Sequence, residues 1–157
     1  RPTLRDMPAR EEKLTIVCLQ HPSCLSWLED VDGQTLVEHE GLRQILWEAI
    51  IAHGEEGCLN PATLLSRLDE IPVKNWVAAT FCVESEVSAE DALEVAQDCL
   101  SLMQRDVKQR KSRDITRQIA EAQRLGDLEK VQALFMEKVQ LNRELTGIGI
   151  SQDGLKK

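Results

Sequence analysis

The segment "CLQHPSC", residues 18–24, holds the residue types that come closest to a metal site in this chain. Cys18, His21 and Cys24 stand three residues apart, and thiolate with imidazole is a ligand set that Zn²⁺ prefers. Structural zinc sites usually combine two closely spaced ligand pairs, and no second pair follows. Pro22 also disfavours helical geometry at the residue before it. We therefore interpret the motif as a helix end, and we predict no metal ligands and no cofactor.

Nucleophilic or acid–base catalysis has no better support. The three histidines, His21, His39 and His53, do not lie beside a glycine-flanked serine or cysteine of the kind that hydrolases use. Acidic pairs such as Glu55-Glu56 and Asp69-Glu70 fall at turns and helix starts, where carboxylates stabilise the helix N-terminus. No glycine-rich loop could cradle a phosphate. We predict no catalytic residues in this chain.

Cysteine usage and apolar patterning bear on the cellular compartment. Five cysteines is an odd number, and all lie among apolar neighbours, so we expect reduced thiols that pack as small hydrophobic side chains. No run of about eighteen apolar residues is present, and no secretory signal begins the chain. These features predict a cytoplasmic protein without direct membrane contact. Because the first residue is Arg1 rather than Met, we expect a segment of a longer protein.

Charge divides the chain into two parts. Residues 1–107 carry 8 Lys and Arg against 20 Asp and Glu, a net charge of −12. Residues 108–157 carry 11 against 7, a net charge of +4. The first part would repel a phosphate backbone, whose binding depends on neutralising phosphates. A protein partner is therefore the expectation for that surface.

Hydrophobic periodicity predicts an all-α protein. Apolar residues recur at offsets of 3, 4 and 7, and Pro and Gly lie mostly between the apolar runs. Asn60 is expected to cap a helix that starts at Pro61, and Gly54 is expected to end the helix before it. The predicted helices are Glu11–Gln20, about Ser23–Glu29, Glu40–His53, a short helix from Pro61, Val73–Val83, about residues 90–125, and Leu128–Leu145.

The last two predicted helices form a hairpin. Gly126 can end one helix and Asp127 can start the next, so the second helix would return antiparallel to the first. We expect a helical bundle with a long helix leading into a projecting C-terminal helical hairpin. The predicted organisation is a flexible leader over residues 1–10, the bundle over 11–107, the hairpin over 108–148 and a flexible tail over 149–157.

The hairpin also carries the candidate binding residues. One face of the second helix can pair with Ile115, Ile119 and Ala122, which leaves other apolar residues for a helix-packing partner. Five cations lie within residues 108–117. Three interpretations are open: a solvated helix face, a contact for an acidic protein surface, and a nucleic-acid site. Which face docks stays open. The predicted partner-binding residues are Arg117, Arg124, Leu128, Phe135, Met136, Lys138 and Val139.

Three motifs in this order resemble the C-terminal, helicase-binding domain of bacterial DNA primase. They are "KLTIVCLQHP", a helix ending in His-Pro; "EGLRQILWEAI"; and "RQIAEAQRLGDLEKVQALF", a hairpin that turns at Gly-Asp. The resemblance covers residues 11–146. It implies that the hairpin docks on the N-terminal domain of the hexameric replicative helicase, that the domain modulates both activities, and that the zinc-binding and polymerising domains of the primase lie outside this chain.

Two alternatives accompany this interpretation. The N-terminal domain of the replicative helicase is similar in fold, and a nucleic-acid-binding helical domain could use the basic residues 108–117. Some primases of the family also bind the acidic tail of the single-strand DNA-binding protein through basic residues of the bundle. Here residues 29–98 contain only Arg43, Arg67 and Lys74 as cations, which puts that second partner in doubt.

Overall fold

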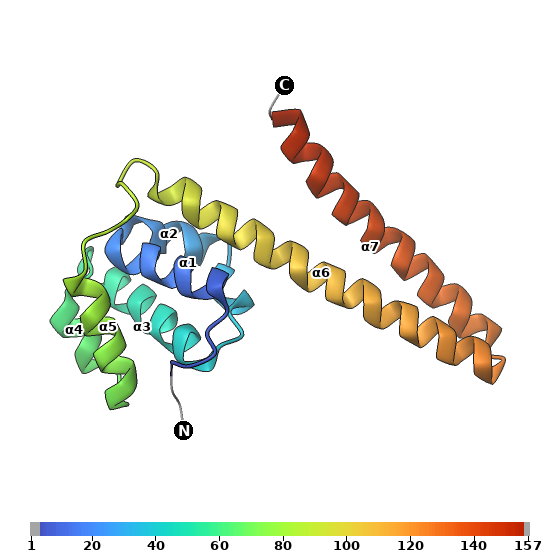
Figure 1. Cartoon of the computed structure of the whole chain (residues 1–157), viewed down its shortest axis with the longest axis horizontal. Helices are drawn as coiled ribbons and strands as arrows, with labels where there is room; N and C mark the ends of the chain where they lie inside the picture. The colour runs from blue at the N-terminus through green and yellow to red at the C-terminus, as the bar shows by residue number, and fades with distance from the viewer. Residues whose placement is uncertain (1–3, 156–157) are drawn as a thin grey trace. The chain divides into compact units, whose positions relative to one another are not determined.

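The computed structural model of the chain describes the backbone of residues 4–155 and the side chains of residues 4–146. Within these residues it contains seven α-helices, one short 3-10 helix and no strand, which confirms the predicted all-α class (Figure 1). The chain divides into two compact units, residues 1–103 and 104–157, called unit 1 and unit 2. No helix in the described part combines the length and apolar character needed to cross a bilayer.

Unit 1 is a helical bundle around one apolar core. Leucines such as Leu14, Leu42 and Leu46 are fully buried at its centre. The first part of α6 contributes Ala96 and Leu100 to the same core. The elements of unit 1 are α1 (Ala9–Gln20), α2 (Ser23–Asp30), η1 (Gly33–Leu36), α3 (Glu40–Glu56), α4 (Pro61–Ser66), α5 (Ile71–Cys82) and the start of α6 (Ala92–Leu125).

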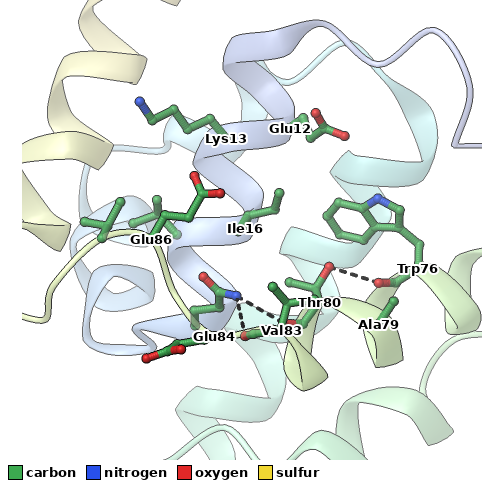
Figure 2. A pocket seen from close by; sticks show the side chains of 12 residues that line it. Glu12, Lys13, Ile16, Trp76, Ala79, Thr80, Val83, Glu84 and Glu86 are labelled. Carbon is green, nitrogen blue, oxygen red and sulfur yellow. Dashed lines mark hydrogen bonds between the residues drawn. The ribbon is translucent and has the colours of Figure 1, made fainter.

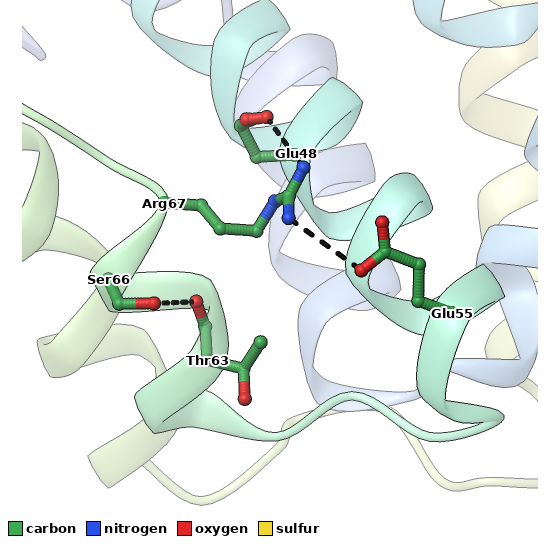
Figure 3. Close-up of polar contacts among 5 residues, drawn as sticks. All are labelled: Glu48, Glu55, Thr63, Ser66 and Arg67. Carbon is green, nitrogen blue, oxygen red and sulfur yellow. Dashed lines mark hydrogen bonds and ion pairs between the residues drawn. The ribbon is translucent and has the colours of Figure 1, made fainter.

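A side-chain cap defines the start of α4, and ion pairs hold its end. The Asn60 carboxamide oxygen accepts a hydrogen bond from the Ala62 N–H at 2.9 Å, as the sequence predicts. At the other end of α4, the Arg67 guanidinium lies 3.6 Å from a Glu48 carboxylate oxygen and 3.8 Å from one of Glu55 (Figure 3). These two ion pairs tie the end of α4 to α3.

Residues of the predicted leader contact the bundle. Leu4 and Met7 pack against the core, and the Arg5 carbonyl lies 3.1 Å from His39 Nε2. His39 Nδ1 accepts from the Leu42 N–H and so caps α3, which leaves Nε2 as the nitrogen that donates to Arg5. These contacts join part of the predicted leader, residues 1–10, to the bundle, and its flexibility stays a prediction; residues 1–3 lie outside the described part.

A buried carboxylate joins α1 to α3. Glu11 is only 6% exposed, although acidic residues at a helix start are usually solvated. Its Oε1 accepts hydrogen bonds from the backbone N–H groups of Glu38, at 3.1 Å, and His39, at 2.9 Å. These donors precede the N-terminus of α3, so the negative charge also lies at the favourable end of that helix.

The C-terminus of α3 differs from the expectation. We predicted that Gly54 ends the helix, but α3 continues to Glu56 and Gly57 is the terminating residue. Gly57 has φ of 74°, and its N–H donates to the His53 carbonyl at 2.8 Å. Glycine is favoured there because a Cβ is strained in the left-handed region. Gly54 has no such requirement and lies within the helix.

Two further features concern α5 and α6. The helix predicted as Val73–Val83 begins earlier, at Ile71, and Pro72 occupies its first turn, where a missing N–H costs nothing. In α6, Leu93 is 43% exposed, whereas Ala92 and Cys99 are buried. Small residues on this face allow α6 to approach the bundle closely, and Leu100 and Met103 complete the face.

Unit 2 consists of the second part of α6 and of α7 (Leu128–Leu155), which returns antiparallel to α6 (Figure 1). The turn between them has the geometry of a Schellman motif. Gly126, with φ of 74°, donates to the Gln123 carbonyl at 3.1 Å, and the Asp127 N–H donates to the Ala122 carbonyl at 3.0 Å. The Asp127 carboxylate then accepts from the Lys130 N–H and caps α7.

The end of α7 lies beyond its predicted position. The predicted helix ends at Leu145, but the helical backbone extends to Leu155. The predicted flexible tail, residues 149–157, therefore overlaps the helix, and Lys156 and Lys157 lie outside the described part. Glycine at positions 147 and 149 lowers helix propensity, which is why the sequence predicted an earlier end.

The two glycines of α3 give a paired test of where this helix ends. Gly57→Ala should lower the free energy of unfolding by about 1 kcal/mol, because alanine is strained at positive φ. Gly54→Ala should raise it by about 0.5–1 kcal/mol, because alanine is the better residue in a helix interior and its Cβ meets nothing within 4 Å. Urea unfolding followed by circular dichroism measures both. The reverse result, in which Gly54→Ala is destabilising and Gly57→Ala is stabilising, would show that the helix ends at Gly54.

Candidate protein-interaction site

The residues of the opening motif have separate structural roles. Cys18 and Cys24 are buried in the core of unit 1, whereas His21 follows the last residue of α1. His21 Nε2 lies 2.8 Å from both the Ser85 hydroxyl and the Val87 carbonyl. Since a carbonyl only accepts, Nε2 is the protonated nitrogen in the bond to Val87. The predicted helix end is confirmed, and its histidine holds the segment that follows α5.

The cysteines divide into two environments, which corrects the expectation that all five pack in apolar surroundings. Cys18, Cys24 and Cys99 are buried, and burial is the largest cause that raises the pKa of each of these thiols. Cys58 and Cys82 are exposed. Within residues 4–146, no three His, Cys, Asp or Glu side chains are placed to hold one metal ion.

The hairpin of unit 2 has a single apolar seam. Ile115, Ile119 and Ala122 of α6 pack against Leu134 and Leu141 of α7, and Val131 packs at its edge. The pairing of the α6 residues with one face of α7 is confirmed. The seam positions are four and three residues apart on α6 and three and seven apart on α7, the spacing of helices that pack side by side.

Four apolar side chains of α7 lie away from this seam, and we call them the α7 stripe: Leu128, Phe135, Met136 and Val139. Leu128 is 74% exposed, Phe135 58% and Met136 71%, while Val139 is half-buried. Leu128, Phe135 and Val139 are offset by seven and four residues, so they share one helical face. Exposed apolar side chains that share a helical face mark a surface suited to a partner.

The three predicted cations have different surroundings. Arg117 forms an ion pair with Asp114, and Arg124 forms one with Glu121, both with a residue three positions earlier on α6. Both arginines are exposed, so these pairs contribute little to stability. Lys138 instead lies at the interface of the two helices, where its Nζ donates to the Thr116 hydroxyl at 2.7 Å. The hairpin therefore uses Lys138 internally.

Leu125 is an exposed apolar residue that was not among the predicted partner-binding residues. It is 65% exposed at the end of α6, three residues before Leu128 in the chain. Its position outside the seam of Ile115, Ile119 and Ala122 is the signal that could have identified it. Leu125 and Leu128 together make the turn of the hairpin apolar.

Polar contacts continue the hairpin interface beyond the apolar seam. Ser112 donates to the Asn142 side chain at 3.5 Å, and Lys108 Nζ lies 3.6 Å from a Glu144 carboxylate oxygen. Within the predicted basic run, Lys108 is thus engaged with α7, and Arg117 with Asp114. These contacts lower the positive charge that the run can offer to a nucleic acid.

Thiol reactivity should follow the two cysteine environments. In the native protein, a disulfide reagent such as DTNB should modify two thiols, Cys58 and Cys82, rapidly. The other three should react only after unfolding in guanidinium, because burial hinders access and keeps the thiols protonated. Absorbance of the released thiolate counts the modified groups. Rapid modification of all five in the native state would contradict the buried placement.

Adjacent residues of α7 should separate packing from surface exposure. Leu134→Ala should lower the stability of the hairpin by about 2 kcal/mol or more, because Leu134 is 8% exposed and fills the seam. Phe135→Ala should change it by less than about 0.5 kcal/mol, because this side chain is mostly solvated. Amide hydrogen exchange over residues 108–146 measures both effects. Equal destabilisation by the two variants would place Phe135 in the packing as well.

Comparisons with family models, with curated proteins and with solved structures found no match to this chain. The resemblance to the primase domain therefore depends on the three sequence motifs, and the function proposed below depends on the exposed surface of the hairpin.

Proposed function

We propose that this chain is a non-catalytic interaction domain of a bacterial DNA primase that binds the N-terminal domain of the hexameric replicative helicase. The intact protein would then synthesise primers through domains outside this chain, in the bacterial cytoplasm. The observation that carries the proposal is the α7 stripe. A different face of α7 already packs against α6, so the stripe is an apolar surface without a partner inside the hairpin.

Burial of the α7 stripe can supply the affinity. Covering a side chain such as Leu, Phe or Met contributes roughly 1.5–3 kcal/mol when it passes from water to a packed interface. The stripe offers three such side chains that are more than half exposed, Leu128, Phe135 and Met136. Part of this gain is offset by the cost of association, so only well-packed anchors determine the affinity.

Charges on α6 would act mainly on the rate and specificity of binding. Arg117 and Arg124 are exposed and paired only with carboxylates of their own helix. Such cations can exchange partners at low cost and steer an acidic surface toward the hairpin. They therefore belong to the rim of the proposed interface, around the apolar anchors.

Two alternatives receive less support. Nucleic-acid binding would need the cations of residues 108–117, of which Lys108 and Arg117 are engaged in ion pairs. Binding of an acidic single-strand-binding-protein tail would need cations on unit 1, and Arg67 lies between Glu48 and Glu55. We propose neither of these partners for this chain.

Phe135→Ala should weaken binding to the N-terminal domain of a cognate replicative helicase by about 1–3 kcal/mol, roughly 5- to 150-fold, because it removes a buried aromatic anchor. Isothermal titration calorimetry of the intact chain measures the change. Gln140→Ala serves as the matched control, since Gln140 is also exposed on α7 but lies outside the stripe.

The control should bind as the wild-type chain does. If Phe135→Ala keeps its helicity and binds with unchanged affinity, Phe135 is not part of the interface. If the wild-type chain itself does not bind the helicase domain, the proposed function is wrong, although the helical fold remains.

A further inference from the structure

Unit 1 carries a groove on its surface. It is formed by α1, the second half of α5 and the segment after α5, and its volume is about 450 Å³ (Figure 2). This volume falls within the roughly 300–1,000 Å³ that is typical of binding sites. The apolar side chains that line it are Ile16, Val17, Trp76, Ala79, Val83 and Val87.

The groove has the length of a peptide site. Its lining residues run from Glu12 to Gln20 along α1 and from Trp76 to Val83 along α5. At 1.5 Å per residue, these stretches extend for about 10–12 Å, or roughly two helical turns. An occupant that follows both helices would therefore be an elongated segment of several residues with one or two apolar side chains directed inward.

The far edge of the groove is held in place by the end of α1. Gln20 Nε2 donates to the carbonyls of Thr80 and Val83, each at 3.1 Å, and His21 bonds Ser85 and Val87 as described above. The histidine of the opening motif thus positions the segment that carries Glu84 and Glu86. The groove is a formed feature of the fold, because hydrogen bonds from Gln20, at the end of α1, and from His21, directly after it, set the position of its edge.

The charges around the groove are predominantly negative. Glu12, Glu84 and Glu86 line it, against a single cation, Lys13. In the view of Figure 2, Glu84 and Glu86 lie on one side of Ile16, and Glu12 and Trp76 lie on the other. The C-terminus of α5 adds partial negative charge, and no basic residue lies in its last turn. An apolar floor with an anionic rim is complementary to a cationic, apolar ligand.

We propose that this groove binds a short peptide segment of a partner protein that combines a large apolar residue with Lys or Arg on either side. The apolar residue would occupy the floor between Ile16 and Val83, and the cations would meet the glutamates of the rim. An arginine over Trp76 would gain a further cation–π contact. This site is separate from the hairpin and does not depend on the function proposed above.

Other occupants are less complementary to the groove. Nucleic acid and anionic lipid would bring phosphates toward the three glutamates. Residues 108–117 of a second copy supply cations. Their one large apolar side chain, Ile115, is buried in the hairpin seam. A segment of another protein that carries both an exposed apolar anchor and cations satisfies both parts of the groove.

The test is selection of a random twelve-residue peptide library on the intact chain, followed by anisotropy titration of the enriched peptides. Enriched sequences should pair Leu, Ile, Phe or Trp with Lys or Arg. Ala79→Trp should weaken their binding at least about tenfold, because the indole fills the groove. Ala120→Trp is the matched control, since Ala120 is an exposed helical alanine of unit 2, and it should leave the affinity unchanged.

A charge variant tests the rim without filling the groove. Glu84→Gln combined with Glu86→Gln should weaken binding several-fold and reduce its salt dependence, because two attractive charges are lost. Glu90→Gln with Glu94→Gln, two exposed carboxylates outside the groove, should not. Enrichment of acidic or uncharged peptides, no enrichment at all, or equal binding to wild type and Ala79→Trp would each overturn the proposal.

A second copy as the occupant gives a different result. In that case the wild-type chain would form a dimer in sedimentation velocity runs and Ala79→Trp would be monomeric, which would also overturn the assignment to a partner peptide. A monomeric wild-type chain that binds the selected cationic peptides supports it.

Discussion

Two helices packed against each other share only one contact surface, and this constraint determines what unit 2 buries and what it exposes. The seam accepts Ile115, Ile119 and Ala122 from α6, and Leu134 and Leu141 from α7. Phe135 follows Leu134 directly, about 100° further round the helix, so it cannot enter the same seam. A third helix or a partner is needed to cover it. The proposed interaction function follows from this shortage of internal surface, because a helix with apolar residues on two faces requires two neighbours.

In unit 1, by contrast, polar side chains form hydrogen bonds between elements of the same unit. Glu11 and His39 satisfy the backbone donors at the start of α3, and Gln20 and His21 bond the carbonyls at and beyond the end of α5. Side chains that suggest chemistry when read in the sequence therefore serve as connections between helices. The result is a well-positioned groove edge rather than a reactive centre, and the same His-Pro helix end that resembles the primase domain also shapes the proposed peptide site.

Electrostatics separates the two proposed surfaces. The negative charge of residues 1–107 gathers partly around the groove, as Glu12, Glu84 and Glu86, whereas residues 108–157 have a net positive charge and include the exposed Arg117 and Arg124. The hairpin would thus attract a partner through an acidic surface on that partner, and the groove would attract a ligand through basic residues of that ligand. Because charges affect association rates more than final affinity, the apolar floor and the apolar stripe would supply most of the binding energy in both cases.

The sequence alone determined the helical class, most helix positions and the turn of the hairpin, because periodicity, Asn60, Pro61, Gly126 and Asp127 act through local geometry. It also identified Leu128, Phe135 and Met136 as surplus to the seam. Local signals failed where tertiary contacts decided the outcome. Gly54 and Gly57 are equivalent as helix-ending residues in the sequence, Leu93 and Ala92 both fit a core-facing stripe, and the exposure of Leu125 depends on where the seam stops. The groove could not be predicted at all, since α1 and α5 are separated by some fifty residues and meet only when the core of unit 1 forms.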